Sequence, residues 1–167
     1  MSNNNLVSRA KMGDRQAFAA LYTTYKDSLY RYAYFKLGNA VDAQDAVSNC
    51  IVEAYSGIAL LKNEQAFQGW IFRILYRECC RLLRDNISRR VEERLDDHEH
   101  LPSHDSHLAP ELSEALATLS AEEKDIVLLS VVAGYKTREV AGMLGLNHST
   151  VRSKLSRALA KMKNFLE

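Results

Sequence analysis

Apolar residues recur at three- and four-residue steps through most of this 167-residue chain, and few helix-breaking residues interrupt them. With only 2 prolines and 7 glycines, the chain lacks the frequent turns that a protein of many short strands needs. Ala17, Phe18, Leu21, Tyr25 and Leu29, for example, form one apolar stripe along a helix. This spacing predicts an all-α protein.

The N-terminal half is predicted to hold three helices, which are separated by residues that favour helix ends. Asp14 can cap the first helix, Gly38-Asn39 can end it, and Asp42 can cap the second. The apolar pattern of the second helix predicts that Tyr55 lies on its buried face. Lys62-Asn63-Glu64 then breaks the pattern before a third helix.

Charge is divided into three blocks, although the net charge of the whole chain is only +1. Residues 1–90 carry 13 basic and 8 acidic side chains, residues 91–123 carry 1 and 10, and residues 124–167 carry 8 and 3. The two basic blocks are therefore separated by an acidic one. We expect a helical domain at residues 1–91, a linker at 92–110 and a second helical domain at 111–167.

The acidic linker also contains histidines, namely His98, His100, His104 and His107. Histidines beside carboxylates can bind zinc or a softer transition metal, but a flexible polar tether explains the composition more simply. A second alternative is that the third helix continues past Arg90 before the chain becomes irregular. We expect the tether and the first five residues to be mobile, and we predict no bound metal.

The segment from Thr137 to Leu155 has the features of a helix-turn-helix. Ala141 is small where the second helix must approach closely, and Gly145 permits the sharp turn. Thr137 is predicted to cap the first helix of the motif and Asn147 the second. A plain helical hairpin with solvated charges is the alternative, but the caps, the small residue, the turn glycine and the basic outer face agree with the motif.

In this motif, outward residues near the start of the second helix meet base edges in the major groove, while neighbouring side chains hold the phosphates. The predicted base-contacting residues are His148, Ser149, Arg152 and Ser153. The predicted phosphate-contacting residues are Lys136, Thr137, Lys154 and Arg157. The C-terminal domain is therefore predicted to bind duplex DNA.

Short motifs in the two halves of the chain occur in an order that points to one family. The C-terminal motifs are Gly134-Tyr135, Glu139-Val-Ala141, Leu144-Gly145 and Thr150-Val-Arg-Ser-Lys-Leu155. The N-terminal motifs are Ala17-Phe-Ala-Ala-Leu-Tyr22, Asp42-Ala-Gln-Asp-Ala46 and Phe67-Gln-Gly-Trp-Ile-Phe-Arg-Ile74. Together they resemble the two-domain, extracytoplasmic-function family of RNA polymerase sigma factors.

The resemblance implies two binding surfaces on the N-terminal domain. Docking on core RNA polymerase is expected at Asp42, Gln44, Asp45, Asn49 and Glu53. Reading and melting of the upstream promoter element is expected at Asn63, Glu64, Gln65, Arg73, Arg77, Arg81 and Arg84, of which the arginines line one helix face. The family usually has a glutamate where Gln44 stands, and commonly has Asn and Asp where Arg77 and Arg81 align. A solvated acidic face and an ordinary charged stripe are the alternatives.

These features predict a sigma factor that binds core RNA polymerase and promoter DNA and directs promoter-specific transcription initiation. The resemblance also implies an anti-sigma factor as a partner. We expect no enzymatic activity, no cofactor and a cytoplasmic location without membrane insertion, because nucleotide-binding loops, long apolar runs and the apolar core of a signal peptide are missing. Cys50, Cys79 and Cys80 are predicted to be free thiols.

Two other functions remain open from the sequence. A stand-alone helix-turn-helix regulator would use the N-terminal half for sensing or dimerisation, and would bind duplex DNA without polymerase. An enzyme or metal-binding protein would use the histidines of the linker.

Overall fold

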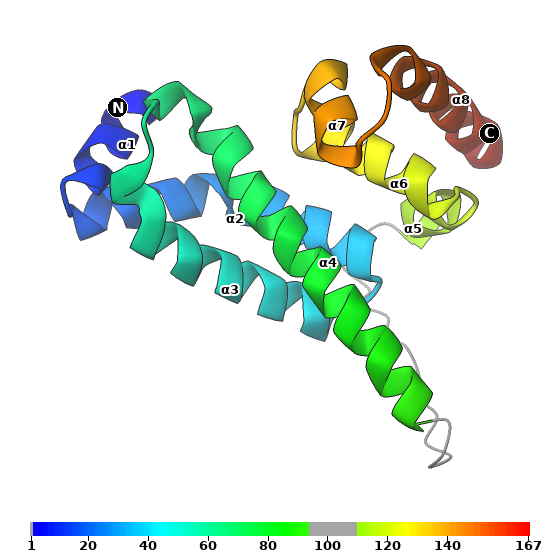
Figure 1. The fold of residues 1–167 in the computed structure, drawn as a ribbon, viewed down its shortest axis with the longest axis horizontal. Coiled ribbons are helices and arrows are strands. Elements are labelled where there is room, and N and C mark those ends of the chain that lie inside the picture. The colour runs from blue at the N-terminus through cyan, green and yellow to red at the C-terminus, as the bar shows by residue number, and fades with distance from the viewer. Residues whose placement is uncertain (1, 94–109) are drawn as a thin grey trace. The chain divides into compact units, whose positions relative to one another are not determined.

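The computed structural model describes residues 2–93 and 110–167, which belong to two compact units, Met1–Ser103 and His104–Glu167. Every regular element in these ranges is helical, which confirms the predicted fold class (Figure 1). Unit 1 contains α1 (Asn3–Lys11), α2 (Arg15–Leu37), α3 (Ala40–Gly57), the 3-10 turns η1 (Ile58–Leu60) and η2 (Glu64–Ala66), and α4 (Phe67–Glu93). Unit 2 contains α5 (Pro110–Ala117), α6 (Ala121–Val127), the π-helical turn η3 (Leu128–Val132), α7 (Thr137–Leu144) and α8 (His148–Leu166).

Unit 1 is a bundle in which α2, α3 and α4 pack around a core rich in aromatic side chains. Tyr32 of α2 and Phe72 of α4 are both buried and meet edge to face, with their ring centroids 6.0 Å apart. Nearer the start of both helices, Tyr25 contacts Phe67, the first residue of α4, at a centroid distance of 5.4 Å. These contacts fix α4 against α2, and α3 packs on both helices.

The ends of α2 follow the sequence prediction. The Asp14 carboxylate accepts hydrogen bonds from the backbone N–H groups of Gln16 and Ala17, at 3.0 and 3.1 Å. Gly38 ends the helix in the left-handed conformation, with φ 82°, which a residue with a Cβ adopts only at a cost.

The start of α3 differs from the prediction, because Asp42 is not its cap. The helix begins at Ala40, and the side-chain oxygen of Asn39 accepts a hydrogen bond from the Asp42 N–H at 2.8 Å. Asn and Asp are both good N-cap residues. Asn39 takes the cap position because it directly follows Gly38, whose left-handed conformation ends α2.

Residues 3–5, which were expected to be mobile, instead form the first turn of α1. Ser2 caps α1 by accepting a hydrogen bond from the Asn5 N–H at 3.3 Å. Val7 is fully buried and Ala10 nearly so, and α1 contacts α2, η1 and η2. A short polar helix is marginal by itself, so packing is what stabilises α1.

The third predicted helix, α4, continues past Arg90 to Glu93, which confirms the alternative of a longer helix. Its C-terminal part extends beyond the ends of α2 and α3 in Figure 1. Most of the predicted linker at 92–110, including its four histidines, lies outside the described residues.

In unit 2, α6 begins with a capping box, as the sequence Ser120-Ala-Glu-Glu123 predicts. Ser120 Oγ accepts from the Glu123 N–H at 3.1 Å, and the Glu123 carboxylate accepts from the Ser120 N–H at 3.4 Å. The helix after this cap is not regular to its end, because it widens into the π turn η3. There the Ala133 N–H donates to the carbonyl of Leu128, five residues earlier. Val131, which lies within η3, is 62% exposed.

The predicted helix-turn-helix is formed by α7 and α8. Gly145 has φ 68° at the turn, and the Leu146 N–H donates to the Ala141 carbonyl at 3.0 Å. Val140 and Val151 are fully buried, one from each helix. Within the two ranges that the structure describes, no helix is both long and apolar enough to cross a membrane.

Candidate functional site

One face of α8 collects hydroxyl and guanidinium groups. Ser149, Arg152, Ser153, Ser156 and Arg157 line a single open depression on the surface. Their spacing of three and four residues places them on one side of the helix. We call this set the α8 row. The sequence prediction missed Ser156, although it follows Ser149 by two helical turns and could have been found from that spacing.

Most polar groups of the α8 row have no partner among the residues that the structure describes. Over the part of the chain that the structure describes, the side chains of Ser149, Arg152, Ser153 and Ser156 make no hydrogen bond. Arg157 Nε donates to the Ser153 carbonyl at 3.3 Å, which leaves the rest of its guanidinium exposed. The row therefore offers hydroxyls and fixed positive charge to an external ligand.

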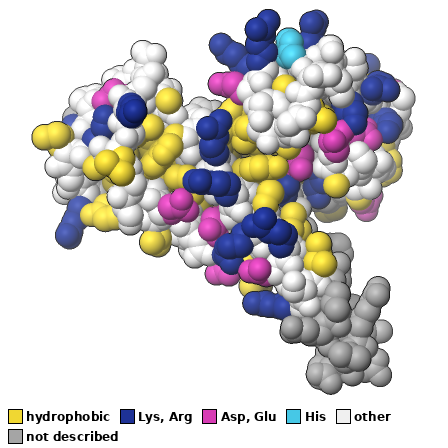
Figure 2. Space-filling model, in the orientation of Figure 1, with side chains coloured by type: hydrophobic (Ala, Val, Ile, Leu, Met, Phe, Trp, Pro, Cys, Tyr) yellow, Lys and Arg dark blue, Asp and Glu magenta, His cyan; other side chains and the backbone are white. Residues whose placement is uncertain are grey.

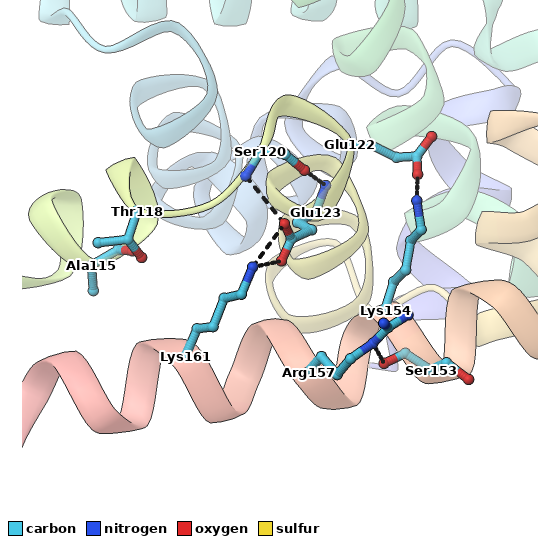
Figure 3. Close-up of polar contacts among 9 residues, drawn as sticks. All are labelled: Ala115, Thr118, Ser120, Glu122, Glu123, Ser153, Lys154, Arg157 and Lys161. Carbon is cyan, nitrogen blue, oxygen red and sulfur yellow. Dashed lines mark hydrogen bonds and ion pairs between the residues drawn. The ribbon is translucent and has the colours of Figure 1, made fainter.

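Next to the α8 row, two lysines tie α8 to α6 (Figure 3). Lys154 forms an ion pair with Glu122, and Lys161 Nζ lies 3.1 and 3.2 Å from the two carboxylate oxygens of Glu123. The hydrogen bond from Lys161 holds the pKa of Glu123 below its usual value, and bonds from Ser120 act in the same direction. Lys154, which was predicted to contact phosphate, thus points toward α6 rather than outward.

His148 is also engaged within the protein, contrary to its predicted role as an outward residue. Its Nε2 lies 2.8 Å from Thr137 Oγ1, so the first residues of α7 and α8 are joined by a hydrogen bond. The prediction that Thr137 caps α7 is wrong, because Lys136 precedes the helix and its N–H donates to Glu139 Oε2 at 2.7 Å. The Lys136 side chain is exposed, as a phosphate contact requires. Asn147 stands at the cap position of α8, but its side chain makes no capping bond.

The arginine row of α4 lies on one face of the helix, and Figure 2 shows basic side chains gathered along α4. Arg73, Arg77 and Arg84 are exposed, whereas Arg81 is half-buried. Arg81 donates to Glu78 at 2.9 Å and to Asp85 at 3.0 Å. The bond to Glu78 raises the pKa of Arg81, so this arginine is charged but already paired.

The predicted docking face on α3 is exposed at Gln44, Asp45, Asn49 and Glu53. Asp42 differs from these four: it is half-buried, and its Oδ2 accepts from Asn39 at 2.8 Å and from Asn86 of α4 at 2.9 Å. Asp42 is therefore better placed to hold α4 than to meet a partner.

Two polar contacts join the docking face to the arginine row. Asn49 Nδ2 donates to Glu78 at 3.3 Å, and Arg77 donates to Glu53 at 3.3 Å. The two predicted surfaces are therefore neighbours on α3 and α4, and a partner that binds one of them changes the charge environment of the other.

The loop before α4 has three polar residues with three different environments. Asn63 Oδ1 accepts from the Gln65 N–H at 3.0 Å, so its side chain caps η2. Glu64 accepts from Lys11 Nζ of α1 at 3.1 Å. The exposed side chain of Gln65 makes no hydrogen bond within residues 2–93 or 110–167.

The cysteines are free, as predicted. Cys50 and Cys79 are buried, and burial raises the pKa of each thiol to about 12, so neither is a thiolate at neutral pH. Cys80 is half-buried. No group of three or more metal-binding side chains occurs in the described ranges.

Comparison with known families matches both units separately. The family model described as "Sigma-70 region 2" matches residues 21–89, and the one described as "Sigma-70, region 4" matches residues 110–162. The first match covers α3 and most of α2 and α4, and the second covers α7 and most of α8.

Similar proteins extend over nearly the whole chain. RNA polymerase sigma factor SigV of Bacillus subtilis is 30% identical over 159 residues, which cover 93% of this chain and 94% of SigV. ECF RNA polymerase sigma factor SigE of Mycolicibacterium smegmatis is 28% identical over 168 residues, and the match spans 92% of this chain but 64% of SigE. A solved structure of the sigma factor RpoE in complex with the anti-sigma factor NepR, from Bartonella quintana, has the same fold, with a TM-score of 0.72 at 22% identity over 89% of this chain and 96% of that one.

Proposed function

The chain belongs to the sigma-70 family of RNA polymerase sigma factors, in its extracytoplasmic-function branch, and we propose on that basis that its two units share the work of promoter-specific transcription initiation. Unit 1 binds core RNA polymerase and the melted upstream element, and unit 2 binds duplex DNA. One observation supports this division. The region 2 unit has adjacent acidic and basic faces, and the recognition helix of the region 4 unit has an exposed polar row that makes little use of its hydrogen-bonding groups within the described residues. The chemistry of RNA synthesis is left to the polymerase, so the chain needs no active site.

In unit 2, we propose that the α8 row lies in the major groove. Ser149, Arg152 and Ser153 read base edges, since an arginine can bond a guanine edge in bidentate fashion and a serine hydroxyl can both donate and accept. Lys136 and Arg157 hold the phosphates and fix the register of the helix. His148, Thr137 and Lys154 orient the helix through their contacts with α7 and α6.

In unit 1, the proposed docking face consists of Gln44, Asp45, Asn49 and Glu53. Its exposed carboxylates suit a basic partner surface, and such charge complementarity speeds association and fixes orientation. Arg73, Arg77 and Arg84 face the negatively charged backbone of the upstream element. An unpaired base of the opened strand is bound at the loop that contains Asn63, Glu64 and Gln65.

An anti-sigma factor is the proposed regulator, because a relative of this fold has been solved bound to one. Such a partner silences the chain if it covers the docking face or the α8 row. We also propose that the protein works in the cytoplasm, where polymerase and promoter are found.

The test is a pull-down of core RNA polymerase by the purified chain, followed by transcription in vitro from genomic fragments. We expect binding of the core enzyme and initiation at a small number of sites when both components are present. Binding to duplex DNA without any affinity for polymerase would overturn the proposal in favour of a stand-alone regulator.

A further inference from the structure

The short helix α1 lies outside both matched family segments, yet it contacts the loop proposed to hold the unpaired base. The region 2 match begins at residue 21, whereas α1 ends at Lys11. α1 contacts η1 and η2, the two 3-10 turns on either side of Leu61–Asn63. Its role is therefore assigned neither by the family match nor by the docking and arginine surfaces.

An ion pair makes the connection between α1 and this loop specific. Lys11 Nζ lies 3.1 Å from Glu64 Oε1, and the two side chains are 20% and 35% exposed. The pKa of Glu64 is lowered, first by a hydrogen bond from its own backbone N–H and then by Lys11. The carboxylate is thus held in its charged form by two donors inside the protein.

The two other polar side chains of the loop, Asn63 and Gln65, have different roles. Asn63 fixes the backbone of the loop, and Gln65 is exposed to an external ligand. Asn63 uses its side-chain oxygen to cap η2, through the bond to the Gln65 N–H. That bond fixes the backbone of Gln65 while its side-chain amide stays exposed, without a hydrogen bond in the described part of the chain. An amide offers one acceptor and two donors, which is what a base edge requires.

We propose that Lys11 is a positioning residue for promoter opening, which holds the loop through Glu64 so that the Gln65 amide meets the unpaired base. Glu64 then acts on the loop rather than on the base. This inference rests on the proposed function, because it names how the loop of that same site is held.

The test is a charge exchange across the pair. A promoter is first selected from random-sequence DNA with the wild-type chain bound to core polymerase, and permanganate reactivity of unpaired thymines then reports the rate of opening. We expect Lys11→Met and Glu64→Gln each to slow opening about two- to fivefold, the range of a partly exposed ion pair. The double variant should be no slower than either single variant, and Lys11→Glu combined with Glu64→Lys should recover most of the rate.

The matched control is Lys26→Met, which removes an equally charged but exposed lysine of α2 that makes no hydrogen bond among the described residues. It should open promoters at the wild-type rate. Circular dichroism is used to check that each variant is folded at the assay temperature. If Lys11→Met is unfolded, the exchanged pair is tested in its place, because it keeps an ion pair between the two positions.

Three results would overturn the inference. Normal opening by a folded Lys11→Met shows that the pair has no role in positioning. A loss on Glu64→Gln that a folded Lys11→Met does not reproduce shows that Glu64 acts on the base and not through Lys11. A wild-type chain that binds core polymerase but opens no promoter overturns both the inference and the proposed melting role, whereas failure to bind polymerase overturns the proposed function as a whole.

Discussion

The polar surfaces of the two units differ in how far their side chains are already bonded to the protein. In unit 1, cross-helix contacts join Glu53 to Arg77, Asn49 to Glu78 and Asp42 to Asn86. In unit 2, the only hydrogen bond of the α8 row within the described residues runs from Arg157 to the Ser153 carbonyl. The contacts with other helices come from the neighbouring Lys154, Lys161 and His148. The polar surface of unit 1 is therefore a preformed hydrogen-bonded network, whereas the α8 row of unit 2 is a set of separate groups on one helix.

This difference has a consequence for binding. When one side chain of a hydrogen-bonded network is removed, the contributions of its neighbours to binding fall as well. The effects of substitutions within the network on binding free energy are therefore not additive. Separate groups on one helix face act independently, and each can contribute a large amount where it meets a base. We expect coupled behaviour from unit 1 and independent behaviour from unit 2.

The largest effect is expected from Arg152→Ala in unit 2. Loss of a bidentate contact with guanine should cost about 1–3 kcal/mol of binding free energy on the selected promoter and should relax specificity at one base pair. Binding assays with the holoenzyme on the selected promoter and its single-base variants measure this. Lys163→Ala, which removes an exposed lysine near the end of α8, is the control. Equal weakening on all sequences would show that Arg152 contacts phosphate instead.

The inward bonds of unit 2 give the next effect. His148→Ala and Thr137→Val should be coupled by about 1 kcal/mol in DNA affinity, because each removes the same hydrogen bond between α7 and α8. A double-mutant cycle on the selected promoter measures this coupling. If the two losses simply added, and only His148→Ala relaxed base specificity, His148 would be a reader of bases as the sequence first indicated.

A smaller coupling is expected across the two faces of unit 1. Glu53→Gln and Arg77→Met should be coupled by about 0.5 kcal/mol in affinity for core polymerase, since both side chains are about half exposed and such pairs are weak. Ser149→Ala with Arg152→Ala on DNA is the matched pair in unit 2, and should show no coupling. Coupling between Ser149 and Arg152, without coupling between Glu53 and Arg77, would contradict the distinction between a network in unit 1 and separate groups in unit 2.

The smallest effect is on acid stability. Because Lys161 lowers the pKa of Glu123, this carboxylate stabilises unit 2 fully above its unfolded value near 4.5, and the contribution is lost as the pH falls through the lower folded value. Thermal unfolding followed between pH 5.5 and 3 should show a shallower pH dependence for Glu123→Gln than for the wild type. An unchanged slope would show that the capping box and its lysine do not bear on acid unfolding.

The fold class, the cap at Asp14, the capping box at Ser120 and the helix-turn-helix could be predicted because they depend on local patterns. Periodicity and capping are properties of a few neighbouring residues. The helix α1 could not, since its polar sequence predicts no helix and its stability comes from burying Val7 and Ala10 against distant residues. Tyr55 was predicted to be buried and is 49% exposed, because its ring stands edge-on to Phe18 at the margin of the core.

In the candidate site too, features set by local spacing could be predicted from the sequence, whereas features set by long-range contacts could not. Which residues lie on the outer face of α8 follows from helical spacing, and the sequence identified most of that row. Which of its neighbours turn inward depends on contacts made far along the chain, such as Lys154 with Glu122 and Lys11 with Glu64. Periodicity contains no information on these partners, so Lys154, His148 and Glu64 were predicted to face outward.

The most direct test of the division of work between the units is footprinting of the selected promoter with the chain alone, with core polymerase alone and with both. We expect protection of the duplex upstream element and permanganate-reactive bases at the start region together, and only when both components are present. Strong protection by the chain alone, unchanged when polymerase is added, would contradict it.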